Sequence, residues 1–492
     1  MTDRISFKPT SKKRAPIIKN TSGGPKRPTL EHTLAELKDC TDVIHRTFPH
    51  IQTHIVYFPT MTDPNLLMDD VIIPLTHVNE QDVDNLLMQS QFVETTDPKK
   101  CIIDILSGHV AIFRGEQTYT VYAFGPQSRQ VQTSEMETVI TGPHDAFVED
   151  AEKNISLIRR RLKSSHLKAI RIGVGEITKT NVFVLYLQDI ANPDIVQKFI
   201  DRIKGIETDS VLDNNMLVQM IDENPNSVFP QYMTTERPDA AVSKLLGGKV
   251  IAVSDGSPSA ICGPTSFFEF FASPEDYYQR WALGTALRLL RLIAFIITLT
   301  FTAFYVSITT FHYEMVPKDL LVSLAESRNK VPFPPLMEAL LMEITIELLR
   351  EAGARLPTKI GQTIGIVGGI VIGSAAVEAG LYSNILIIVV ASSAIASFVI
   401  PSYTMSASIR LLRFGLIFAA GMWGNIGLIL GLGAIIIHLS GVTNLGTSYL
   451  TPIAPMTFSD WKDTFLRAPL WSLNNRSSQS KAVNHERNKM KR

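Results

Sequence analysis

Four glycines at four-residue spacing and one carboxylate mark the stretch with the most distinctive side-chain chemistry. The carboxylate is Glu378, and the glycines before it, in GQTIGIVGGIVIG, are Gly361, Gly365, Gly369 and Gly373. In water each glycine would weaken a helix by about 1 kcal/mol relative to alanine. In lipid a helix is nearly enforced, and the absent side chains let neighbouring backbones approach closely. The pattern therefore predicts a membrane helix that packs against other helices.

The small-residue surface is broad, and three arrangements would use it. Gly368, Ala375, Ala376 and Ala379 widen it. Such a groove can pack helices within one subunit, pack helices of identical subunits, or line a pore where small side chains leave room. A ring of Glu378 carboxylates, one per subunit, would concentrate cations at a pore mouth. The alternative is a carboxylate that lies at the interface, and spacing alone leaves these alternatives open.

A second group of ionisable residues lies in PFPPLMEALLMEITIELLREAG, residues 332–353. Pro334 and Pro335 suit the start of a helix, where a missing N–H costs nothing. Leu341, Ile344 and Leu348 mark an apolar face, and the other face carries Glu343, Glu347, Arg350 and Glu351. Because the apolar stretch is shorter than a membrane span, we expect an amphipathic or re-entrant helix over residues 333–351. A fifth span is the competing interpretation.

The sequence carries no motif typical of an enzyme. The patterns G-x-x-x-x-G-K-[ST], H-E-x-x-H, C-x-x-C and G-x-S-x-G are absent, so we expect no catalytic residue, metal or cofactor. The three cysteines are odd in number and far apart, which argues against a disulfide framework and fits a reducing compartment. The balance of 47 basic and 47 acidic side chains gives no reason to expect a nucleic-acid partner.

The first 280 residues have the mixed polarity of a soluble α/β region. Residues 1–28 hold eight basic residues and one acid, which predicts a disordered arm that either solubilises the chain or is attracted to anionic lipid. Residues 29–141 and 142–280 each mix strand and helix patterns, so we expect two small α/β subdomains. The expected strands lie in HIQTHIVYF, CIIDILSGHVAIFRGEQTYTVYAF, KAIRIGVGEI, NVFVLYLQDI and GKVIAVSDGSPSAICGP; the expected helices lie in GPHDAFVEDAEKNISLIRRRL and NPDIVQKFIDRIKGI.

Residues 281–440 predict an all-α transmembrane bundle. Between residues 360 and 439 only Glu378, Arg410 and Arg413 are charged. Four apolar segments, 292–311, 360–379, 384–400 and 411–439, are expected to span the membrane. The last is longer than a hydrocarbon core requires, so we expect it to be tilted, kinked or extended beyond the bilayer. His438, near its end, is expected at the interface.

The basic flanks of this domain predict its orientation. Arg280, Arg288 and Arg291 precede the first span, and residues 441–492 form a basic tail. By the positive-inside rule both ends lie in the cytoplasm, which four spans satisfy. Four spans turn Arg410 and Arg413 outward, however, and this conflicts with the same rule. Five spans would place the two arginines inside but send the basic tail out.

These segments resemble the A subunits of GerA-type spore germinant receptors. The resemblance covers about residues 142–470 and is weak over residues 1–141. It is densest in GPHDAFVEDAEKNISLIRRRL, ERPD, SPEDYYQRW and VPFPPLMEALLMEITIELLREAGARLPTKIGQTIGIVGGIVIGSAAVEAG. It implies a multi-pass protein of the spore inner membrane with a large cytoplasmic N-terminal region.

The resemblance also implies partners and an activity. Such A subunits work with a multispanning, transporter-like B subunit and a lipoprotein C subunit, and the B subunit is the expected binder of a small nutrient. The A subunits are expected to assemble into an oligomeric, nutrient-gated ion channel. On this chain the glycine stripe and Gln362 become pore or inter-subunit positions, and the coupling helix comprises Pro334, Pro335, Glu338, Glu343, Glu347 and Arg350. A non-conducting scaffold and a substrate transporter remain alternatives, although no inverted repeat is found among the spans.

Overall fold

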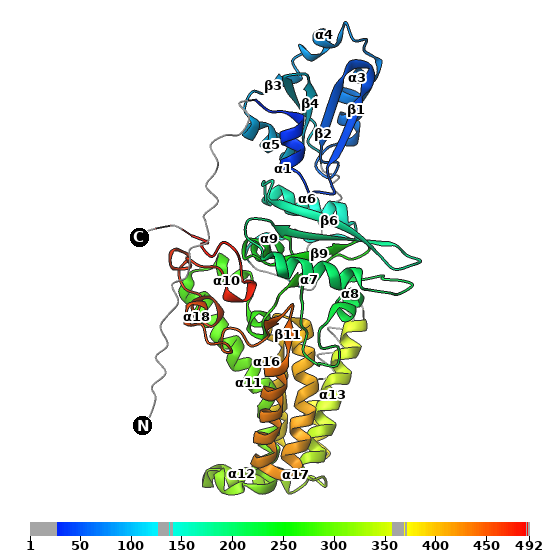
Figure 1. Cartoon of the computed structure of the whole chain (residues 1–492). Helices are drawn as coiled ribbons and strands as arrows, with labels where there is room; N and C mark the ends of the chain where they lie inside the picture. The colour runs from blue at the N-terminus through cyan, green and yellow to red at the C-terminus, as the bar shows by residue number, and fades with distance from the viewer. Residues whose placement is uncertain are drawn as a thin grey trace, which may run out of the picture. The chain divides into compact units, whose positions relative to one another are not determined.

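The computed structural model describes residues 27–125, 137, 141–356, 369, 371–488 and 490, and the chain forms two compact units (Figure 1). The first unit runs to Lys38 and resumes over Val43–Gly125. The second holds Asp39–Asp42 and the chain from residue 126 onward. It contains an α/β subdomain, a helical bundle and the C-terminal segment.

The first unit is a five-stranded antiparallel sheet of order β1-β2-β4-β5-β3 with short helices. Its strands are β1 (Ile44–Phe48), β2 (Thr53–Tyr57), β3 (Phe92–Glu94), β4 (His109–Arg114) and β5 (Gln117–Tyr122). Its helices are α1 (Leu30–Glu36), η1 (Pro49–Ile51), α2 (Pro64–Leu67), η2 (Met68–Ile72), α3 (Ile73–His77), α4 (Val83–Leu87) and α5 (Pro98–Leu106). β4 and β5 are joined by a tight turn at Gly115, whose φ of +57° suits glycine.

One expected strand of this unit is a helix. The residues CIIDIL lie in α5. This helix begins after Asp97, and the Asp97 carboxylate accepts a hydrogen bond from the backbone N–H of Lys99. An Asp N-cap followed by a proline is a strong helix start, and it outweighs the β-branched residues that follow. The buried residues Cys101, Ile102 and Ile105 then share one helical face.

The α/β subdomain of the second unit is a five-stranded antiparallel sheet of order β6-β7-β9-β10-β8, covered on both faces. Its strands are β6 (Leu167–Val174), β7 (Thr180–Leu187), β8 (Met233–Thr235), β9 (Val250–Ser254) and β10 (Ala260–Gly263). Phe183 and Leu185 pack with α6 (Ala151–Arg161) and α9 (Pro238–Leu246). Val182 and Val184 pack with α7 (Pro193–Lys204) and α8 (Asn214–Ile221). Successive side chains of β7 therefore point alternately into two hydrophobic cores, one on each face of the sheet.

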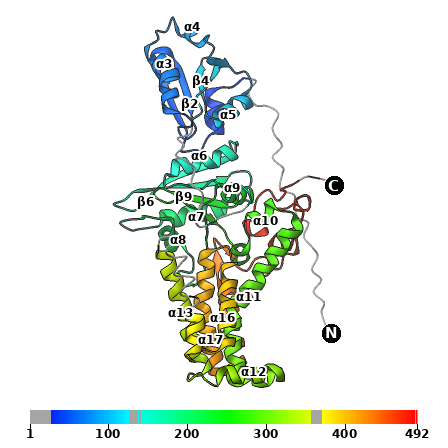
Figure 2. The ribbon, with the colours of Figure 1, turned by 180° about the vertical axis from the view of Figure 1, so that it is seen from behind.

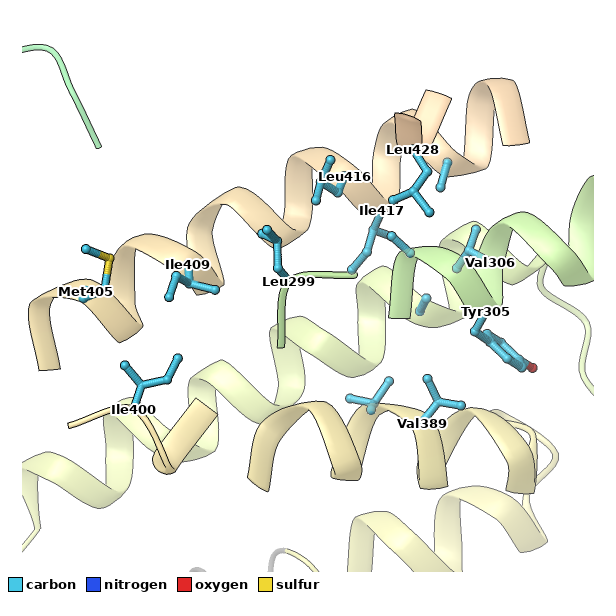
Figure 3. Close-up of a cluster of buried hydrophobic side chains, with 14 of the residues drawn as sticks. Leu299, Tyr305, Val306, Val389, Ile400, Met405, Ile409, Leu416, Ile417 and Leu428 are labelled. Atoms are coloured by element: carbon cyan, nitrogen blue, oxygen red, sulfur yellow. The ribbon is translucent and has the colours of Figure 1, made fainter. Parts of the chain in front are cut away.

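The helical bundle follows η3 (Phe267–Phe271) and α10 (Glu275–Tyr278). Its helices are α11 (Trp281–Phe311), η4 (Tyr313–Met315), α12 (Lys318–Arg328), α13 (Pro335–Arg355), η5 (Val371–Ala375), α15 (Ala376–Glu378), α16 (Asn384–Phe398) and α17 (Tyr403–Gly441). α12 lies at the end away from the second sheet (Figures 1 and 2). Among the described residues two helices, α11 and α17, are long and apolar enough to cross a membrane. Leu299, Val306, Val389, Ile409 and Ile417 form part of the common core (Figure 3).

α17 is a hairpin of two antiparallel helices. Gly424 has φ +61° and ψ −142°, a conformation open in practice only to glycine, and it interrupts the helix. The Ser408 hydroxyl donates to the Val228 carbonyl (2.6 Å), and the His438 ring lies 2.9 Å from the Ser227 hydroxyl. A straight helix would hold residues 408 and 438 about 45 Å apart, so the chain reverses between them. The single span expected over residues 411–439 is therefore wrong, and a sharp reversal at Gly424 replaces it.

The C-terminal segment folds back onto the α/β subdomain. It contains β11 (Thr443–Asn444), β12 (Thr447–Ser448), α18 (Phe458–Thr464), η6 (Leu470–Ser472) and η7 (Ser478–Ser480). The Val483 N–H donates to the Ile190 carbonyl (2.9 Å), and Arg476 Nε donates to the Leu246 carbonyl (2.7 Å). The segment expected as a tail is thus an integral layer of the second unit, at least as far as residue 488.

Candidate functional site

α13 buries the first part of its charged face and exposes its apolar face. Leu341, Ile344 and Leu348 are exposed, the last at 66%, whereas Glu338 and Glu343 are fully buried. A helix surrounded by water would do the opposite, because buried carboxylates need partners and exposed leucines gain nothing. The two faces expected from the sequence are present. α13 packs lengthwise against α11, α16 and α17, which fits a re-entrant helix or a fifth span better than a helix that lies flat at the interface.

A buried ion pair joins α13 to α17 in the middle of the bundle. Arg413 Nη2 lies 2.5 Å from Glu343 Oε2, and both side chains are 0% exposed. The Thr302 hydroxyl of α11 donates to Glu343 Oε1 (2.9 Å), and Arg413 Nη1 donates to the Ser393 hydroxyl of α16 (2.8 Å). One carboxylate and one guanidinium therefore contact all four helices. A charge pair so far from water persists only when such partners satisfy it.

A second ionic layer lies one turn further along α13. Glu347 Oε1 accepts from Arg410 Nε (3.3 Å), and Glu347 Oε2 accepts from Arg350 Nη1 (3.4 Å). Arg350 Nη2 donates to the Ser397 hydroxyl (3.0 Å), and Arg410 Nη1 donates to the Ser406 hydroxyl (3.0 Å). We call the five charged residues of these two layers the charge ladder; they are Glu343, Glu347, Arg350, Arg410 and Arg413.

Glu338 makes a separate contact toward the other end of α13. Its Oε1 accepts from the backbone N–H of Ser383 (2.5 Å), and Ser383 is the N-cap of α16. The Ser383 hydroxyl also lies 3.1 Å from the Tyr305 hydroxyl of α11. The start of α13 is thereby fixed to the start of α16. The helix itself begins at Pro335, as the prolines predict.

The charge ladder lies toward the α/β end of the bundle. Arg410 and Arg413 belong to the first arm of α17, near Ser408, which contacts Val228 of the second unit's α/β subdomain. This placement differs from the outward position that a four-span arrangement gives the two arginines. The position of α13 accounts for the difference, because one more lengthwise helix before α16 brings Arg410 and Arg413 to the end of the bundle next to the α/β subdomain.

The loop between α8 and β8, residues 222–232, contacts the helical bundle, and we call it the junction loop. Besides holding Ser408 and His438, it accepts a hydrogen bond at the Pro230 carbonyl from the Tyr449 hydroxyl (2.5 Å). Phe229 stacks on the His438 ring with centroids 6.1 Å apart. Burial raises the pKa of the Asp222 carboxyl to about 7, against the opposing charge of Arg202.

The described part of the glycine stripe faces open space. A Cβ built on Gly369 or Gly373 has no described atom within 4 Å, and Glu378 is exposed. Gly361, Gln362, Gly365 and Gly368 lie outside the described residues.

Sequence reasoning missed the hydroxyl and arginine partners of the ladder. Ser393 and Ser397 are four residues apart in ASSAIASF, which places them on one face of α16, toward α13 and α17. In an apolar bundle, serines four residues apart on one helix indicate hydrogen bonds to a neighbouring helix that carries charged residues. Among the described residues no group of three or more His, Cys, Asp or Glu is placed to hold a metal ion.

Fold and site together define a class of protein, in which an α/β region continues into a bundle of apolar helices with buried charges. Residues 31–479 match the family model described as Bacillus/Clostridium GerA spore germination protein. The chain is 42% identical over 453 residues to the spore germination protein GerQA of Bacillus cereus, with 90% of each chain covered. It is 38% identical over 427 residues to the spore germination protein A1 of Bacillus subtilis, with 85% of this chain and 88% of that chain covered.

The chain belongs to the GerA family of spore germination proteins, the A subunits of spore germinant receptors. Another relative, the spore germination protein KA of Bacillus subtilis, is 35% identical over 466 residues, or 90% of this chain and 85% of that one. A crystal structure of the N-terminal domain of the A subunit of the Bacillus megaterium germinant receptor GerK3 matches 48% of this chain and 94% of that one. The TM-score is 0.38 and the identity is 22%.

Proposed function

We propose that the chain is the channel-forming subunit of a nutrient-gated germinant receptor and that it assembles as an oligomer in the spore inner membrane. The observation that carries the proposal is the open face at Gly369 and Gly373, which no described residue covers. Small residues at membrane depth favour close contact between helices, so sister copies are fitting partners for this face. Glu378, exposed at the end of the same segment, would then recur around a cation path.

Six membrane crossings fit this arrangement better than four. The crossings are α11, α13, the segment over residues 360–379, α16 and the two arms of α17. An even number keeps the α/β region and the C-terminal segment on one side, which fits their direct contact. Four of the six crossings precede Arg410 and Arg413, so both arginines would lie toward the cytoplasm, which removes the conflict with the positive-inside rule.

The partner subunits supply the signal in this proposal. A transporter-like B subunit binds the small nutrient, and a lipoprotein C subunit completes the receptor. The charge ladder carries the response from α13 to the other bundle helices. Glu343 and Arg413 together link four helices, α11, α13, α16 and α17. α13 is thus the coupling helix, with Glu338, Glu343, Glu347 and Arg350 as its coupling residues.

Cation flux through the purified chain in liposomes tests the proposal. We expect a flux of monovalent cations that Gly369→Leu lowers about tenfold or more, because a leucine fills the space at which copies meet. The matched control is Gly433→Leu, since a Cβ at Gly433 in α17 also has no described atom within 4 Å. No flux from the complete receptor with its B and C subunits would favour the scaffold, and unchanged flux and oligomer size in Gly369→Leu would contradict the role of the stripe.

Reporter fusions test the six crossings. A reporter fused after Arg492 and one fused before Met1 are both expected in the cytoplasm, and a reporter inserted between α12 and α13 is expected outside. An external reporter at the C-terminus would mean an odd number of crossings and would contradict this arrangement.

A further inference from the structure

α11 as a whole is longer than a membrane crossing needs. Its 31 residues rise about 46 Å, whereas a hydrocarbon core is about 30 Å thick. About ten residues therefore lie outside the core if the helix is upright, or run along its surface if it is inclined. α11 starts beside α10, to one side of the bundle, and slants toward the other helices (Figures 1 and 2).

These first residues expose apolar side chains instead of polar ones. Trp281 is 49% exposed, and the others are Leu283, Leu289, Leu290 and Ile293. The exposed stripe continues without a break through Ile296 into the part of α11 that crosses the membrane. A surface that is continuous with a lipid-facing stripe on one rigid helix has lipid as its natural neighbour.

The C-terminal segment is held on the first turns of α11 and exposes apolar side chains of its own. The Arg467 N–H donates to the Thr285 hydroxyl (3.1 Å), and Arg288 Nη1 donates to the Leu466 carbonyl (3.3 Å). Arg467 Nε also donates to the Asp276 carbonyl (3.0 Å). These contacts hold the segment on the first turns of α11. Its own exposed apolar side chains are Ile453, Met456, Phe458, Leu466, Leu470 and Trp471.

The charges around this surface are arranged for contact with lipid headgroups. Asp276, fully buried, lies 2.7 Å from Arg291 and 3.2 Å from Arg288, so these arginines are already paired. Arg280 and Lys462 remain exposed beside the aromatic residues. Tryptophan and phenylalanine with a few basic groups are the composition of segments that lie in the interfacial layer of a membrane.

We infer that the start of α11 and residues 453–471 form a shelf that lies in the headgroup layer of the cytoplasmic leaflet. The C-terminal segment is thereby a peripheral membrane anchor that holds the α/β subdomain close to the lipid. This inference rests on the membrane placement in the proposed function. It adds that the chain contacts lipid from the side as well as through its crossings.

Tryptophan quenching in nanodiscs tests the shelf. The chain has four tryptophans, at positions 281, 423, 461 and 471, and variants that keep one and carry phenylalanine at the others isolate each signal. Lipids brominated near the headgroup are expected to lower the emission of Trp281 and Trp471 about twofold, as for interfacial aromatic residues. Aqueous iodide is expected to leave that emission unchanged. The water-exposed control is Ile177→Trp in a tryptophan-free background, since Ile177 is 76% exposed next to β6.

Trp423 separates the two levels of the proposal. It lies at the reversal of α17, where the bundle would meet the opposite leaflet, and it is exposed. If brominated lipid quenches Trp423 but neither Trp281 nor Trp471, the shelf is overturned while the membrane crossings stand. If it quenches none of the three, the membrane placement itself is overturned. Shielding of Trp281 and Trp471 from both quenchers would mean that protein covers the surface, which also overturns the shelf.

Discussion

Arg413→Met is expected to destabilise the helical bundle by about 3–5 kcal/mol, because it leaves the Glu343 carboxylate buried without its counter-charge. The hydroxyl of Thr302 would be its remaining partner among the described residues. The measurement is thermal unfolding of the purified chain in detergent, together with germination of spores that carry the variant. The control is Arg355→Ala on α13, the helix that carries Glu343, because Arg355 is 78% exposed in its pair with Glu351. Such exposed pairs contribute little.

A double variant separates stability from coupling. Glu343→Leu with Arg413→Met replaces the pair by apolar groups, which is often neutral or stabilising for a buried ion pair. We therefore expect its melting temperature to return near that of the unmodified chain. If the ladder also transmits the nutrient signal, germination stays impaired despite the restored stability. An Arg413→Met chain as stable as the unmodified one would contradict the ladder as a structural centre.

Gly424→Ala is expected to disrupt the hairpin of α17. The conformation at Gly424 costs a residue with a Cβ on the order of 1–3 kcal/mol. The added Cβ would also lie 2.9 Å from His312 Nε2 and 3.1 Å from Phe311 Cβ. Both effects oppose the reversal, so the second arm loses its position beside the first. The expected result is a large fall in melting temperature and faster proteolysis of the C-terminal segment.

The control for this substitution is Gly415→Ala. Gly415 lies in the first arm of α17, and a Cβ built there has no described atom within 4 Å. It is helical, so alanine is expected to leave stability unchanged or raise it slightly. Equal melting temperatures for Gly424→Ala and Gly415→Ala would contradict the reversal at Gly424.

The local elements of the α/β region were largely predictable from sequence. β6, β7, β9 and β10 follow from β-branched alternation and the DGSP turn, and α7 follows from its Asn-Pro start and apolar period. The sequence predicts a strand where α5 lies, because Ile102, Ile103 and Ile105 favour β-structure. The Asp97 cap and Pro98 favour a helix start instead, and the structure follows the cap.

The bundle was less predictable, for two physical reasons. Hydropathy measures how apolar a segment is, and it does not show where a chain reverses, so Gly424 looks like the glycines around it. Amphipathicity gives two faces, but which one is covered depends on the solvent, and α13 has its faces reversed relative to a helix in water. The arginine partners that α17 supplies to Glu343 and Glu347, Arg413 and Arg410, lie more than 60 residues away, and only tertiary structure brings them together.

The attachment of α17 has a mechanical consequence. Both arms end on neighbouring residues, Val228 and Ser227, and they meet again at Gly424. A hairpin clamped at Ser408 and His438 acts as a rigid rod about 24 Å long, so a tilt of about 5° at the clamp displaces the tip at Gly424 by about 2 Å. Small rotations of the sheet are thereby enlarged at the far end of the bundle.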